Sequence, residues 1–77
     1  MTHDADNVYV WFLVGPRGRI IAAGEADTVP DDLVVDLRNK LERHGCDPVP
    51  GSSYAVDYWM GRRLVGSVAL PSSEVFA

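Results

Sequence analysis

Cys46 lies two residues after His44, and a thiol near an imidazole is a pairing that nucleophilic enzymes use. The two residues flank Gly45, which we expect to end a helix, and the negative end of a helix dipole raises the pKa of a thiol. A thiolate nucleophile is therefore disfavoured. His3, His44 and Cys46 are too few and too scattered for a zinc site. We expect no catalytic residue, no metal and no cofactor.

Other motifs of catalysis and ligand binding are incomplete. Residues 15–18 contain two glycines and an arginine but lack the spacing of a phosphate loop and its following lysine. The serine pair at 52–53 has no nucleophile-elbow motif around it. Asp27, Asp31 and Asp32 do not follow the alternating spacing of a calcium loop. The sequence therefore favours a protein that is not an enzyme.

A run of acidic residues stands out between positions 25 and 36, where five acids occur in twelve residues without a base. Helix capping explains one or two of them. We interpret the others, Glu25, Asp27, Asp32 and Asp36, as an acidic ridge that contacts a basic surface on a protein partner. The net charge of -4 agrees with this, because it disfavours nonspecific binding to nucleic acid or anionic lipid.

The stretch from 8 to 14 is a strand signal in which every residue is apolar. On a pleat of period two, Val8, Val10, Phe12 and Val14 point to one side. Tyr9, Trp11 and Leu13 point to the other. A chain of this length can supply one helix to cover one face. We expect the second face, with Tyr9, Trp11, Leu13 and Trp59, to form an interface, and we expect a two-fold homodimer.

The other elements follow from turn and helix signals. Glycine and proline at 15–18 and glycine at 61 predict turns of two hairpins, with strands at 8–14, 19–26, 54–60 and 64–70. Gly24 is interpreted as a bulge or bend. A capping box formed by Thr28 and Asp31 predicts the start of a helix, and Gly45 predicts its end. Its expected buried stripe is Leu33, Leu37 and Leu41, with Asp36 facing water.

These elements predict an α+β fold of two layers in the order β-β-α-β-β: a four-stranded antiparallel sheet with one helix on one face. We expect a single domain over 1–77, with a flexible lead-in at 1–6 and a tail at 72–77. Residues 18–23 and 61–66 share an arginine after a glycine, which we attribute to turn chemistry rather than to a repeat. The arginines of the two turns, Arg17, Arg19, Arg62 and Arg63, are expected at opposite ends of the sheet.

The single cysteine fits a reducing compartment, and the acidic start lacks the pattern of a signal peptide. No run is long and apolar enough for a membrane span, so we expect a cytoplasmic protein. In size, acidity and lack of catalytic motifs the chain resembles small phage-borne inhibitors such as anti-CRISPR proteins, which implies a noncatalytic module that binds a basic surface of a nucleic-acid-handling machine. The alternative is a small-molecule-binding or enzymatic domain at a homodimer interface, lined by Tyr9, Trp11, Tyr58 or Trp59.

Overall fold

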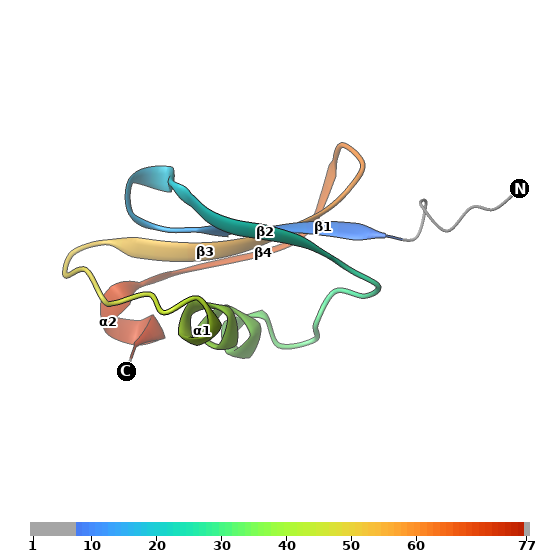
Figure 1. Cartoon of the computed structure of the whole chain (residues 1–77). Coiled ribbons are helices and arrows are strands. Elements are labelled where there is room, and N and C mark those ends of the chain that lie inside the picture. Colours follow the sequence, from blue (N-terminus) through green and yellow to red (C-terminus); the bar gives the residue numbers. More distant parts are fainter. Residues whose placement is uncertain (1–7, 77) are drawn as a thin grey trace, which may run out of the picture.

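A computed structural model describes residues 8–76 and confirms the α+β class, with a four-stranded antiparallel sheet and one main helix (Figure 1). The predicted lead-in at 1–6 lies outside the described residues. The elements in chain order are β1 (Tyr9–Val14), the 3-10 turn η2 (Pro16–Gly18), β2 (Ile20–Ala26), α1 (Leu33–Arg43), β3 (Ser53–Met60), β4 (Arg63–Pro71) and α2 (Ser72–Val75).

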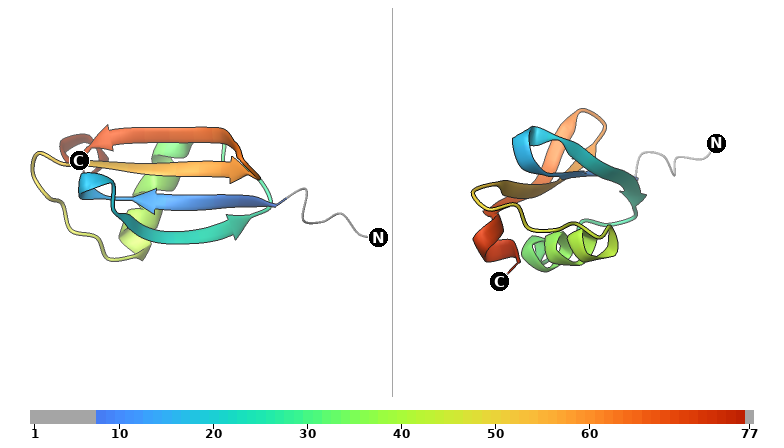
Figure 2. Two further views of the ribbon diagram at one scale, coloured as in Figure 1. Left: turned by 90° about the horizontal axis from the view of Figure 1, so that it is seen from above. Right: turned by 60° about the vertical axis from the view of Figure 1, so that its left-hand side comes forward.

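The strands lie in the order β2-β1-β3-β4, so the two hairpins meet through β1 and β3. α1 crosses diagonally under one face of the sheet, and no element covers the other face within the described residues (Figures 1 and 2). In the β1–β3 register Val14 pairs with Ala55 and Val10 with Trp59. The turn after β1 therefore lies at the end of the sheet where β3 begins. The two arginine-bearing turns are at opposite ends, as predicted.

The face of β1 that meets the helix is the reverse of the expected one. Leu13 pairs with Val56 and Trp11 pairs with Tyr58, so these residues share a face. Leu13, Val56 and Tyr58 are fully buried against α1, and Tyr9 and Trp11 pack onto the same core. The prediction that Tyr9, Trp11 and Leu13 form the uncovered face is therefore wrong. Only Trp59 of that predicted set lies on the open side.

The helix begins later than the capping box predicted. Oδ1 of Asp32 accepts hydrogen bonds from the backbone N–H groups of Val34 and Val35, both at 3.1 Å, so Asp32 is the N-cap. The residues from 27 to 32 instead carry the chain from the end of β2 to β4, where Val29 lies against Gly66. Residues that were predicted to form the first helical turn therefore belong to this connection.

The end of α1 matches the prediction. Gly45 adopts a φ of 65°, its N–H donates to the Glu42 carbonyl, and the Cys46 N–H donates to the Leu41 carbonyl. These two bonds form a Schellman motif, in which the left-handed residue is best filled by glycine.

The core lies between α1 and the sheet. From the predicted stripe Leu37 and Leu41 are fully buried, while Leu33 is half-buried and packs on the same core. The tail docks back onto it as α2. Val75 is buried, and the rings of Phe76 and Tyr54 are nearly perpendicular, with 5.1 Å between their centroids. The buried apolar side chains are Leu13, Leu37, Leu41, Tyr54, Val56, Tyr58 and Val75.

The two hairpins have the same internal register. Each has a bulge in its outer strand shortly after the turn, one at Ile21 and one at Val65. Each pair of the first hairpin has a counterpart in the second. Val14–Ile20 matches Trp59–Leu64; Leu13–Ala22 matches Tyr58–Gly66; Phe12–Ala23 matches Asp57–Ser67; Trp11–Gly24 matches Val56–Val68; and Val10–Glu25 matches Ala55–Ala69. Because Phe12 also pairs with Asp57, the sheet has a pseudo-two-fold axis between these residues. In this register Ile20 corresponds to Leu64, so the similarity between residues 18–23 and 61–66 is offset by one residue, and its attribution to turn chemistry stays a prediction.

Gly24 is not a bulge. A Cβ at this position would lie 2.6 Å from Cζ2 of Trp11, so the glycine makes room for the indole ring on the helix side of the sheet. The bulge of β2 is at Ile21 instead.

Leu37→Ala should lower the free energy of unfolding by about 2 to 5 kcal/mol, because it leaves a cavity at a side chain with 0% exposure. Val35→Ala is the matched control, since Val35 lies on the same helix and is 47% exposed. Chemical denaturation of both variants measures the difference. Equal losses for the two variants would contradict the packing of α1 described above.

Candidate functional site

The open face of the sheet is mostly apolar. Adjacent residues across the four strands form three rows, each running from β2 to β4: Glu25, Val10, Trp59, Leu64; then Ala23, Phe12, Asp57, Ser67; then Ile20, Val14, Ala55, Ala69. The polar members of these rows are Glu25, Asp57 and Ser67. Since α1 lies on the far side of the sheet, nothing in the described part of the chain covers these side chains.

Two bulky aliphatic side chains stand at opposite corners of this face. Ile20 is 58% exposed and Leu64 is 49% exposed. Each lies beside the bulge of its hairpin, and a bulge increases the local bend of a strand. Both hairpin tips curve away from the helix layer, so they rise on the same side as the open face (Figure 1). The sheet thus offers an apolar floor with raised ends.

Asp57 is the charged residue near the centre of this floor. The Ser67 hydroxyl donates a 2.7 Å hydrogen bond to Oδ1 of Asp57, which holds the carboxylate in place. Asp57 is half-buried, and its partner on the neighbouring strand β1 is Phe12. The sequence interpretation missed it as a site residue. The signal that could have found it was a single acid alternating with Ala55 and Trp59 on the side of β3 that points away from the core.

The predicted acidic ridge does not exist as one surface. Asp32 is used as the helix cap, and Asp36, which was expected to face water, is turned toward the sheet. Glu25 lies on the open face of β2, while Asp27 is exposed in the connection that follows. The expected placement of Asp36 is wrong because its partners come from α1 and from β3, which is distant in sequence.

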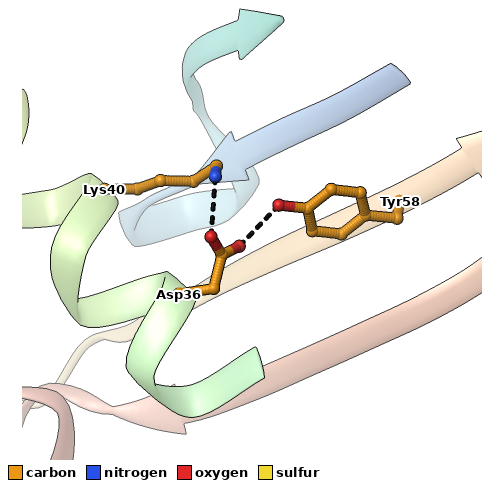
Figure 3. A network of polar contacts seen from close by, with 3 residues as sticks. All are labelled: Asp36, Lys40 and Tyr58. Carbon is orange, nitrogen blue, oxygen red and sulfur yellow. Dashed lines mark hydrogen bonds and ion pairs between the residues drawn. The ribbon is translucent and has the colours of Figure 1, made fainter. Parts of the chain in front are cut away.

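Asp36 is the centre of a polar network between α1 and the sheet (Figure 3). Its Oδ1 lies 2.8 Å from Nζ of Lys40, and its Oδ2 accepts a 2.6 Å hydrogen bond from the Tyr58 hydroxyl. Nζ of Lys40 also lies 4.5 Å from the centroid of the Trp11 ring, at a distance suited to a cation–π contact. This network joins the helix to β1 and β3 through one buried lysine.

The network keeps its phenol protonated. Burial of the ring, the hydrogen bond to Asp36 and the negative charge of that carboxylate all raise the pKa of Tyr58 above its ordinary value. A phenol in this state is a hydrogen-bond donor and not a base. The arrangement therefore positions the helix and offers no activated nucleophile.

The thiol of Cys46 is also held in its protonated form. Burial and the nearby charge of Asp47 raise the pKa of Cys46, and the thiol is half-buried beside the helix end. The His44 ring lies near the Trp11 ring, with 6.4 Å between the two ring centroids and 57° between the ring planes. Within residues 8–76 there is no group of three His, Cys, Asp or Glu side chains arranged for a metal ion; His3 lies outside this range.

A surface hollow of about 510 Å³ lies between the loop at 48–53 and α2. Prolines, serines and Phe76 line it, and no titratable side chain contributes to its wall. It therefore offers shape and hydroxyl groups but no acid, base or cation. No helix in the described part of the chain is long and apolar enough to cross a membrane.

The network predicts how stability changes in alkali. Because the folded protein holds the Tyr58 proton more tightly than the unfolded chain does, the free energy of unfolding should fall as the pH rises above about 10, the tyrosine pKa of an unfolded chain. Tyr58→Phe should reduce this fall. Tyr54→Phe is the matched control, because the Tyr54 hydroxyl donates to the Asp47 carbonyl instead. If both variants keep the wild-type pH dependence in denaturation experiments, Asp36 does not hold the Tyr58 proton.

Comparison of the chain with protein-family models, with curated proteins and with solved structures found no match in any of the three. The case for a function therefore rests on the side chains of the open face and of the polar network.

Proposed function

We propose that this protein is a noncatalytic protein-binding module, and that its partner docks on the open face of the sheet. The observation that carries this proposal is the apolar floor on the open side of the sheet, with half-buried Phe12 at its centre and the exposed side chains of Ile20 and Leu64 at its corners. The largest apolar patch on a protein surface is often an interaction site.

The size of the face supports a small contact. Strands lie about 4.8 Å apart and residues on one face are about 6.7 Å apart along a strand, so three rows on four strands cover roughly 400 Å². A standard interface buries about 800 Å² on each partner. The floor is therefore large enough for the apolar centre of an interface, and the raised hairpin tips supply the polar rim.

The charges of the face favour a heterologous partner. Glu25 and Asp57 are acidic, and the rows of the face contain no base. Two copies stacked by their open faces would place no cation from the facing rows opposite Asp57, because the hairpin arginines lie at the turns, and this is unfavourable. The proposed partner thus carries basic groups, as the acidic ridge also suggested, but it meets a different face. A two-fold homodimer and an anti-CRISPR-like inhibitory role stay predictions.

The alternative of a small-molecule site lined by aromatic residues has less support. Tyr9, Trp11 and Tyr58 lie on the helix side of the sheet, and Trp59 lies on the open side. These residues therefore do not line one common cleft within a chain.

Leu64→Gln and Ile20→Gln should each weaken partner binding by about tenfold or more, because each removes an exposed apolar anchor from the face. The free energy of unfolding should stay within about 0.5 kcal/mol of wild type. The measurement is affinity purification from the source cell, followed by titration of the recovered protein. Val35→Gln is the control, since Val35 is exposed on the opposite layer. A partner that binds the two face variants as tightly as wild type would refute the open face as the site.

A further inference from the structure

We infer that the partner inserts an arginine side chain, surrounded by apolar residues, onto Asp57 at the centre of the open face. This inference rests on the proposed function, since it names the chemistry of the partner that the same face accepts. Its basis is a carboxylate placed among aromatic and aliphatic side chains with no base beside it on the described face.

The pseudo-two-fold register of the sheet places an apolar residue at the position equivalent to Asp57. Asp57 and Ser67 occupy the places that Phe12 and Ala23 occupy in the other hairpin. An apolar pair therefore fits the same register, the same bulge and the same face. Asp57 and Ser67 depart from this apolar pair together, and the Ser67 hydroxyl bonds to the Asp57 carboxylate. We attribute this departure to recognition rather than to stability.

A partner that covers the floor must satisfy Asp57. Covering a carboxylate with apolar groups removes its hydration, which is strongly unfavourable unless a cation or several donors replace the water. Ser67 supplies one donor to Oδ1. The partner must then supply a cation or further hydrogen-bond donors, so a purely apolar surface would be rejected. The carboxylate thus provides specificity on a face whose affinity comes from apolar contact.

Arginine fits this position better than lysine. Phe12 lies across the strand from Asp57, and Trp59 lies two residues along β3 on the same face. A guanidinium group is planar, so it can donate two hydrogen bonds to a carboxylate while its flat side rests on an aromatic ring. The lysine ammonium is a compact, strongly hydrated charge and cannot do both. Glu25 lies about 12 Å away by strand spacing, which leaves it free to meet a second basic residue.

Selection from a displayed library of random linear peptides tests the inference. Peptides are selected on the wild-type protein, and those that compete for the open face are identified by loss of binding to Leu64→Gln. We expect these peptides to contain an arginine next to apolar residues. Asp57→Asn should weaken them by about tenfold or more, because it removes the charge while keeping the shape of the side chain. Replacing the peptide arginine by citrulline or by lysine should also weaken binding.

The control variant is Glu42→Gln, which removes an exposed carboxylate from α1 on the opposite layer and should leave binding unchanged. Circular dichroism establishes that each variant is folded. Face-binding peptides without arginine, or with equal affinity for Asp57→Asn, would overturn the arginine inference and leave the proposed function standing. A selection with no peptide sensitive to Leu64→Gln would contradict the proposed function itself. A wild-type dimer that Leu64→Gln dissociates in light scattering would assign the face to a second copy and overturn the inference.

Discussion

The pairing of β1 with β3 is the constraint on which the rest of the structure depends. Phe12 opposite Asp57 sets the pseudo-two-fold axis, and Leu13 opposite Val56 directs these two fully buried side chains to the helix side. Side chains alternate with a period of two, so a slip of one residue would move Trp11 and Leu13 to the open face. The same register that builds the core therefore also determines which residues stay uncovered.

The helix is held to this core by more than its leucine stripe. Lys40 is buried with its Nζ over Trp11 and paired to Asp36, which in turn binds Tyr58. Gly24 has no side chain, so the Trp11 indole can lie close to β2. In this position the indole contacts Nζ of Lys40. Because a half-satisfied buried network is unfavourable, these contacts specify one position of α1 on the sheet.

Much of the fold could be predicted from the sequence, because hairpin turns, the helix stop at Gly45 and the leucine spacing are local signals. The side of β1 that meets the helix could not be predicted, because both sides of the strand are apolar and only the register with β3 decides between them. The start of α1 was placed too early, because the Thr28–Asp31 pattern is a local capping signal, whereas in the structure the Asp32 side chain caps the helix. Asp36 seemed solvent-facing because Tyr58 is distant in sequence. Asp57 became a candidate only when the register placed it opposite Phe12.

The central claim is that α1 covers the Leu13 side of the sheet and leaves the Leu64 side open. Paramagnetic relaxation of labelled methyl groups by an inert gadolinium chelate tests it directly in the free protein. The methyl groups of Ile20 and Leu64 should relax strongly, whereas those of Leu13 and Leu37, which have 0% exposure, should be nearly unaffected. Relaxation of the Leu13 methyls as strong as that of the Leu64 methyls would show that the helix does not cover the assigned face, and would contradict the account.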